Sequence, residues 1–179
     1  MHKEELKHLL AALTPPNRLA MEISLATGLR ISDVLALKAD EIRRSTDGRV
    51  TVRELKTGKT RRVKLSKELH RRCVALAGRA YVFENRQDWK RPRTRQAVWK
   101  DLKRVARLFR VKGNIAPHTA RKVYAVASYA RSGDLAKVQK LLNHENEAVT
   151  TLYALADELT ARRIGGRPLP LAPPRAGSK

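Results

Sequence analysis

The stretch TGLRISD at residues 27–33 decides how the N-terminal part of this chain folds. Gly28 is a typical helix stop, whereas Ser32 and Asp33 are typical of a helix start, where a side-chain oxygen or a negative charge meets unpaired backbone N–H groups. Arg30 is therefore expected on a short connection between two helices. The helix before this stretch is indicated by apolar residues at helical spacing, Leu19, Ile23 and Ala26.

The hydrophobic period changes from helical to alternating at residues 49–65. Val50 and Val52 alternate with polar neighbours, Val63 and Leu65 do the same, and KTGK at residues 56–59 lies between the two runs. Alternation on both sides of a glycine-containing turn is typical of a β-hairpin. We therefore expect a hairpin whose turn carries lysine.

The rest of the chain reads mainly as helices. Ser66 and Thr94 are expected to cap two of them, and residues 81–84 are expected to add a third short strand. The second of these helices has an apolar face consisting of Val98, Leu102, Val105 and Phe109. Three further helices are expected to begin at Pro117, Asp134 and Asn146.

These elements predict an α+β fold that is mostly helical, with a small antiparallel sheet. From Gly165 the chain turns to glycine, proline and small residues, which favour a flexible tail. We therefore expect one domain over residues 1–164 and a tail over residues 165–179.

The charge of the chain points to a polyanionic partner. Lys and Arg number 39 against 17 Asp and Glu, the net charge is +22 and the pI is about 11.1. Such a surface attracts nucleic acid and releases its counterions on binding. An anionic membrane is the weaker alternative, because no amphipathic or lipidation signature accompanies the charge. No stretch approaches the roughly 20 apolar residues of a membrane span, and no membrane partner is expected. The expected location is the cytoplasm, at the nucleoid.

One cysteine, Cys73, excludes an internal disulfide and a zinc site built on cysteine pairs. Its position on the apolar face of the helix that Ser66 opens favours a small core residue.

A basic block at residues 86–112 is a second indication of a polyanionic partner. It contains eleven Lys and Arg residues but only Asp88 and Asp101 as acids, which favours a DNA-facing surface over a merely solvated one. Together with the hairpin, the block supplies seven candidate DNA contacts: Arg53, Lys59, Arg61, Arg62, Arg91, Arg93 and Arg95.

Carboxylates are too few and too scattered for a two-metal nuclease site, and the chain contains neither a Walker loop nor a dinucleotide fingerprint. We therefore predict no metal and no cofactor. What the chain offers instead is an ordered set of cations, histidines and one tyrosine: Arg30, Lys56, His118, Arg121, His144 and Tyr153.

This set resembles the catalytic domain of the tyrosine recombinases, also called the phage integrase family, over residues 3 to 158. The family pattern is Thr-Gly-Leu-Arg, a hairpin lysine, His-x-x-Arg, Leu-Gly-His and a tyrosine nine residues later. The matching segments are TGLR at 27–30, KTG at 56–58, HTAR at 118–121, LNH at 142–144 and Tyr153. Asp33 matches an acidic position that helps to hold the first arginine. Asn143 departs from the family glycine, although a left-handed helix stop tolerates asparagine.

The resemblance implies DNA strand cleavage and rejoining through a 3′-phosphotyrosyl intermediate, as in integration, excision or inversion. Arg30 and Arg121 would bind the phosphate oxygens, Tyr153 would attack, and Lys56 would protonate the 5′-oxygen. His118 would act as a base or a phosphate donor, and His144 would donate to the phosphate or orient the site. Lys59 competes with Lys56 for the acid role, and Lys56 is preferred because it begins the Lys-Thr-Gly match.

The implied partners are double-stranded DNA and further copies of the chain, which would be a monomer when free and a tetramer on paired sites. The family's separate N-terminal DNA-clamping domain has no counterpart in this sequence, which fits either an excised fragment or a naturally short member.

Three other functions stay open. A type IB topoisomerase uses similar chemistry to relax supercoils, a DNA-binding regulator would share the surface without the chemistry, and a ribosomal or nucleoid protein would share the charge alone. The last reading gives no reason for the six matched positions.

Overall fold

The computed structural model describes residues 8–111 and 115–142. Its contacts divide the chain into two units, Met1–Tyr124 and Ala125–Lys179, which are described separately below. Helix α7 (His118–Ser132) crosses the boundary between them. None of the helices in the described ranges is long and apolar enough to cross a membrane.

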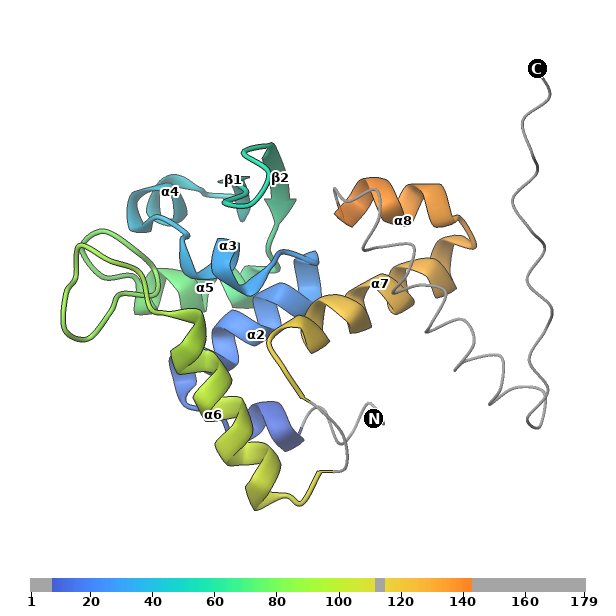
Figure 1. Cartoon of the computed structure of the whole chain (residues 1–179). Helices are drawn as coiled ribbons and strands as arrows, with labels where there is room; N and C mark the ends of the chain where they lie inside the picture. Colours follow the sequence, from blue (N-terminus) through green and yellow to red (C-terminus); the bar gives the residue numbers. More distant parts are fainter. Residues whose placement is uncertain (1–7, 112–114, 143–179) are drawn as a thin grey trace, which may run out of the picture. The chain divides into compact units, whose positions relative to one another are not determined.

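The first unit is mostly helical with one small sheet, which confirms the predicted fold class (Figure 1). Before α7, its elements are α2 (Pro15–Thr27), α3 (Ile31–Leu35), α4 (Ala39–Arg44), β1 (Arg49–Arg53), β2 (Thr60–Lys64), α5 (Lys67–Leu76) and α6 (Arg95–Leu108).

The predicted hairpin is confirmed. Strands β1 and β2 pair antiparallel, with Val50 opposite Val63 and Val52 opposite Arg61. Along β1 the exposed and buried positions alternate, because successive side chains of a strand point to opposite faces.

The expected third strand at residues 81–84 is wrong. Only isolated bridges form there, between Lys38 and Tyr81 and between Glu84 and Pro92. The backbone of this segment bonds to two separate partners, since the Val82 N–H donates to the Leu37 carbonyl and the Phe83 carbonyl accepts from the Arg93 N–H. Each neighbour pairs with this segment over a single bridge, so no continuous ladder forms.

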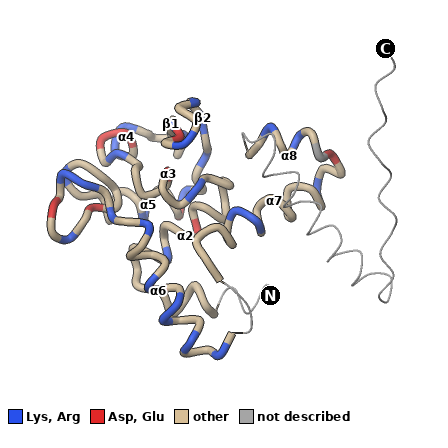
Figure 2. Tube along the Cα trace, in the orientation of Figure 1, with Lys and Arg blue, Asp and Glu red and all other residues tan. Residues whose placement is uncertain are grey.

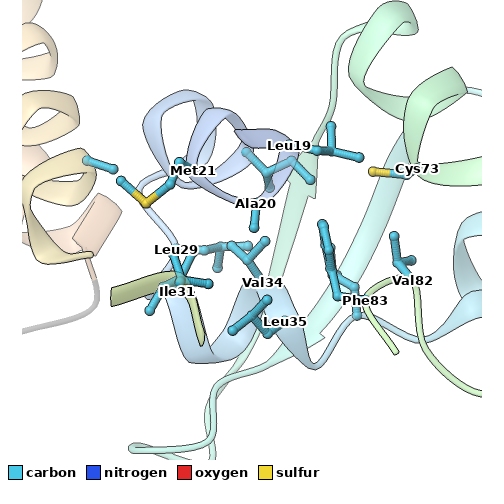
Figure 3. Packing of buried hydrophobic residues seen from close by; sticks show 14 of the residues in the cluster. Leu19, Ala20, Met21, Leu29, Ile31, Val34, Leu35, Cys73, Val82 and Phe83 are labelled. Carbon is cyan, nitrogen blue, oxygen red and sulfur yellow. The ribbon is translucent and has the colours of Figure 1, made fainter. Parts of the chain in front are cut away.

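The core of the first unit is built from α2, α3, the hairpin, α5 and α6. Leu19 and Val34 are buried with Phe83, and Cys73 of α5 joins the same cluster (Figure 3). Burial raises the pKa of the Cys73 thiol to about 12, which agrees with a packing role. Ala26, expected on the buried face of α2, is exposed.

The caps of two helices are as predicted. The Ser66 side chain accepts a hydrogen bond from the Leu69 N–H, and the Thr94 side chain accepts one from the Ala97 N–H. At the other end of α6 the expectation for Phe109 is wrong, because this side chain is 49% exposed. The helix ends at Leu108 with Phe109 as its C-cap, and the left-handed Arg110, with a φ of 49°, turns the chain directly after it. Phe109 therefore lies beyond the part of α6 that packs on the core.

A buried carboxylate joins α6 to the start of α2. Oδ2 of Asp101 accepts hydrogen bonds from the N–H and the hydroxyl of Thr14 and from Nδ2 of Asn17. Oδ1 of Asp101 accepts from Nε and Nη2 of Arg104. The Asp101 carboxylate is therefore a polar link between α6 and the start of α2.

In the second unit, α7 ends at Ser132 and Gly133 follows with a φ of 62°. This agrees with the expected stop. Helix α8 (Leu135–Leu142) begins after Asp134, whose carboxylate accepts from the Lys137 N–H, and its Val138 and Leu142 are buried. The helix expected from Asn146 and the tail beyond Gly165 lie outside the described residues.

Candidate active site

The end of α2 places Arg30. Gly28 closes the helix in the left-handed region with a φ of 69°, and Arg30 then adopts an extended conformation as the N-cap of α3. The predicted stop and the predicted connection are confirmed, but the next helix begins at Ile31, before Ser32, with Arg30 as its N-cap. A Cβ atom on residue 28 would lie 2.4 Å from Cδ1 of Tyr124. Glycine is therefore required both for its φ and for the space that it leaves.

Arg30 is buried between two carboxylates. Its side chain is 6% exposed, Nη1 donates a 2.9 Å hydrogen bond to Oε2 of Glu54, and Oδ2 of Asp33 lies 3.9 Å from the same nitrogen. Burial raises the pKa of the Asp33 carboxyl, although a hydrogen bond from the Leu55 N–H and the charge of Arg30 oppose this shift. The arginine is thus held in one position by acids on two different elements.

Glu54 is the residue that sequence reasoning missed. It is fully buried just after β1, although glutamate is rarely buried without a partner. The signal was present in the sequence, because the alternation that buries Val50 and Val52 continues to residue 54. A carboxylate that points inward from a strand needs a buried cation to compensate its lost hydration, and in this structure that cation is Arg30.

Arg121, on the first turn of α7, lies in the same cluster. Its Nη1 donates a 2.9 Å hydrogen bond to the carbonyl of Gly28. Burial, together with the positive charges of Arg30 and Arg61, lowers the pKa of Arg121 to about 10, whereas Glu54 and Asp33 act in the opposite direction. The fold therefore brings together two arginines that the sequence analysis singled out and that are 91 residues apart in the chain.

Arg61, an expected DNA contact, turns out to be tied to the protein. Its side chain is half-buried on β2, and Nη2 donates a 2.6 Å hydrogen bond to the carbonyl of Thr27. Arg61 and Arg121 therefore donate to the consecutive carbonyl groups of Thr27 and Gly28 at the end of α2.

Lys56 lies on the turn between β1 and β2, as the sequence predicted, and the structure shows that it is exposed. The turn is anchored on both sides of it: the Leu55 N–H donates to Asp33, and the Thr57 hydroxyl donates to Glu54 at 2.9 Å. Lys59, the alternative acid, is also exposed.

His118 is exposed at the first position of α7. It lines a pocket of about 320 Å³ together with Arg95, Gln96, Trp99, Ala116 and Pro117. The other two predicted site residues, His144 and Tyr153, lie outside the described residues.

Basic residues follow the hairpin, α6 and the loop before α6 (Figure 2). Five of the seven candidate DNA contacts are exposed, namely Arg53, Lys59, Arg62, Arg91 and Arg95. Arg93, like Arg61, is half-buried, and its Nε donates to Oδ1 of Asn17 at 2.6 Å. Within the described ranges, no group of three or more His, Cys, Asp or Glu side chains could hold a metal ion.

Comparison with known proteins identifies the group to which this site and fold belong. Residues 1–159 match the phage integrase family. The chain is 31% identical over 154 residues to the tyrosine recombinase XerD of Listeria monocytogenes, a match that covers 80% of this chain and 51% of XerD. The chain therefore belongs to the phage integrase family, the tyrosine recombinases, and it spans about half the length of XerD.

Solved structures show the same fold at lower identity. The XerH site-specific recombinase bound to palindromic difH substrate, in a post-cleavage complex, superposes with a TM-score of 0.68 at 21% identity, over 92% of this chain and 52% of XerH. The lambda integrase catalytic core gives a TM-score of 0.66 at 20% identity, over 82% of this chain and 92% of the core.

Proposed function

We propose that this chain is the catalytic domain of a site-specific DNA recombinase that cleaves and rejoins one strand through a 3′-phosphotyrosyl bond. The observation that carries the proposal is the convergence of Arg30 and Arg121 on the end of α2 in a member of the phage integrase family. Its relatives include XerD, a tyrosine recombinase, and XerH, whose complex contains its DNA substrate.

The two arginines suit a phosphodiester that approaches five-coordination. Negative charge then concentrates on the nonbridging oxygens, and two planar guanidinium groups bind such oxygens with paired hydrogen bonds. Nη2 of Arg30 is buried and has no hydrogen-bond partner among the described residues, so this arginine retains a donor that its carboxylate partners do not use. The lowered pKa of Arg121 also supports the proposal, because a bound phosphate would supply the negative charge that the cluster lacks.

The covalent step would proceed as follows. The phenolic oxygen of Tyr153 attacks the scissile phosphorus and loses its proton to a base, for which His118 is the candidate. The bond from phosphorus to the 5′-oxygen breaks, and Lys56 protonates that oxygen as it leaves. His144 would donate to the phosphate. The 5′-hydroxyl of a partner strand reverses the step, so the bond energy is conserved and no cofactor is required.

The proposed partners are double-stranded DNA and further copies of the chain. The exposed arginines and lysines of the hairpin and of the block at 86–112 would contact the phosphate backbone. We expect a monomer in free solution and a tetramer on paired sites.

The test is capture of the covalent adduct on a nicked half-site duplex. Tyr153→Phe should bind DNA with nearly unchanged affinity and form no adduct, because the ring remains and only the nucleophilic oxygen is lost. Tyr129→Phe is the matched control and should form the adduct at the wild-type rate. Adduct formation by Tyr153→Phe would assign the nucleophile to another residue.

Two further experiments distinguish this mechanism from a metal-dependent reaction and from a type IB topoisomerase. Excess EDTA should leave adduct formation intact, and strict dependence on Mg²⁺ would contradict the mechanism. Efficient relaxation of supercoiled plasmid without strand exchange between duplexes would instead favour a type IB topoisomerase.

A further inference from the structure

Glu54 has structural connections that the proposed function does not account for. Its Oε2 accepts hydrogen bonds from both Nη1 of Arg30 and the hydroxyl of Thr57, each at 2.9 Å. One buried oxygen thus joins the phosphate-binding arginine to the turn that carries Lys56.

The backbone of Glu54 holds the same turn. Its N–H donates to the Lys59 carbonyl at 2.9 Å, and its carbonyl accepts from the Gly58 N–H at 2.8 Å. Both ends of the turn, and the hydroxyl of Thr57 within it, are therefore bonded to this one residue.

A counter-ion role alone does not explain this arrangement. Asp33 already lies 3.9 Å from Arg30, and adding a second fully buried carboxylate carries a desolvation penalty. Oε1 of Glu54 is buried and has no hydrogen-bond partner among the described residues. Burying this second oxygen therefore adds to the energetic cost of placing Glu54 here. What the second carboxylate adds is a connection between two elements 24 residues apart in the sequence.

We propose that Glu54 is a positioning residue that sets the place of Lys56 relative to Arg30. Lys56 lies between two anchored neighbours: Leu55 is bonded to Asp33, and Thr57 is bonded to Glu54. In the proposed function, on which this inference rests, Arg30 acts on a nonbridging oxygen and Lys56 on the 5′-bridging oxygen of the same phosphate. Their separation must match that of the two oxygens, and the shared carboxylate holds it.

The test compares two versions of the half-site duplex. One carries an ordinary scissile phosphodiester, and the other carries sulfur in place of the 5′-bridging oxygen. A thiol has a pKa of about 8.5, so the sulfur leaves as a thiolate and needs no proton from Lys56. A defect in placing the acid should therefore diminish on the sulfur duplex, whereas a defect in binding the nonbridging oxygens should remain.

Thr57→Val removes the hydroxyl link without changing charge and with little change of shape at a half-buried turn position. It also removes the acceptor of a long 3.3 Å hydrogen bond from the Lys59 N–H. We expect cleavage of the ordinary duplex to slow at least 10-fold and cleavage of the sulfur duplex to stay within about 3-fold of wild type. Thr57→Ser, which keeps the hydroxyl, should restore the ordinary rate. Lys56→Ala is the positive control for recovery with sulfur.

Glu54→Gln keeps the side-chain shape but loses the charge that holds Arg30. It should slow both duplexes, with the larger defect on the ordinary one. Glu68→Gln, an exposed glutamate on α5 that pairs with Arg71, is the matched control and should slow neither. Equal defects of Thr57→Val on the two duplexes, or no defect on either, would overturn the positioning role.

Hydrogen exchange gives a readout that does not need activity. Thr57→Val and Glu54→Gln should each accelerate exchange at the amides of Leu55 and Gly58 at least 10-fold, and Glu68→Gln should not. If the wild-type chain forms no adduct on either duplex while Lys56→Ala and Tyr153→Phe behave identically to it, the proposed function fails. Unchanged exchange in the two link variants would overturn the role of Glu54 independently of that outcome.

Discussion

Arg30 and Arg121 occupy the same cluster, but we expect them to contribute unequally to stability. Arg30→Gln would leave Asp33 and Glu54 buried without their nearest cation, and breaking a buried pair in this way costs about 3 kcal/mol. Arg121→Gln loses a hydrogen bond worth about 1 kcal/mol but also removes a cation whose charged form burial disfavours.

We therefore expect Arg30→Gln to lower the free energy of unfolding by about 3 kcal/mol and Arg121→Gln to change it by less than about 1 kcal/mol. Urea unfolding followed by circular dichroism measures both. Both variants should lose adduct formation, so activity and stability separate only at Arg121. Equal destabilisation by the two substitutions would show that Arg121 is also a structural cation.

At the scale of the element, the end of α2 depends on Gly28. Gly28→Ala should cost about 1 kcal/mol for the left-handed backbone, and more because its Cβ would meet the Tyr124 ring at 2.4 Å. Gly58 is the matched control, since its φ is 67° but nothing lies within 4 Å of a Cβ there. Thermal unfolding should place Gly28→Ala well below Gly58→Ala, and the same melting temperature for both would rule out the close approach of Tyr124.

The link between α2 and α6 predicts a pH dependence. Burial acts to raise the pKa of Asp101, but its hydrogen bonds from Asn17, Thr14 and Arg104 outweigh burial and lower that pKa overall. Because the folded-state pKa lies below the unfolded value of about 3.9, the ionised carboxylate stabilises the fold above that pH, and the contribution disappears as pH falls through the folded pKa.

Asp101→Ala should therefore lower the free energy of unfolding by about 3 kcal/mol at pH 7 and flatten its fall below pH 4. Asp40→Ala, with an aspartate that is 78% exposed, is the control and should change stability by less than about 0.5 kcal/mol. The measurement is the free energy of unfolding of the wild type and both variants from pH 2 to pH 7. An undiminished acid transition in Asp101→Ala would assign that transition to other carboxylates.

At the scale of the whole molecule, the charge of +22 predicts DNA binding that is steeply dependent on salt. Each phosphate contact contributes about −0.9 to the slope of log K against log salt. We expect tight binding at low salt, weak binding at physiological salt and little preference for the target site, because phosphate contacts carry little sequence information.

Substituting two arginines of the block at 86–112 should distinguish a residue that contacts DNA from one that stabilises the fold. Arg95→Gln, at an exposed position, should reduce the magnitude of the slope by about 0.9. Arg93→Gln should change the slope less and stability more, because Arg93 is half-buried and donates to Asn17. Fluorescence anisotropy on target and scrambled duplexes measures both slopes, and a strong preference of the chain for its target would mean that it reads bases directly.

Local chemistry made several features of this protein predictable from its sequence. A glycine at a helix end, a hydroxyl before a helix and alternating valines around a turn act within a few residues, and Gly28, Ser66, Thr94 and the hairpin are as expected. Phe109 was placed wrongly because periodicity does not show where a helix ends. The candidate site residues were chosen by their order and spacing, which follow the family pattern, and their roles in the chemistry stay predictions.

Only the tertiary structure decided which charged side chains pair with one another. Arg61 and Arg62 are adjacent and identical in the sequence, yet alternation along β2 exposes Arg62 and turns Arg61 toward the carbonyl of Thr27. Glu54 reads as one charge among many until the hairpin packs beside α3 and places its carboxylate on Arg30. The sequence by itself determined most of the helices and the hairpin, because these depend on short-range propensities. The partners of the buried ions depend on which elements pack together, and that is a property of the folded chain.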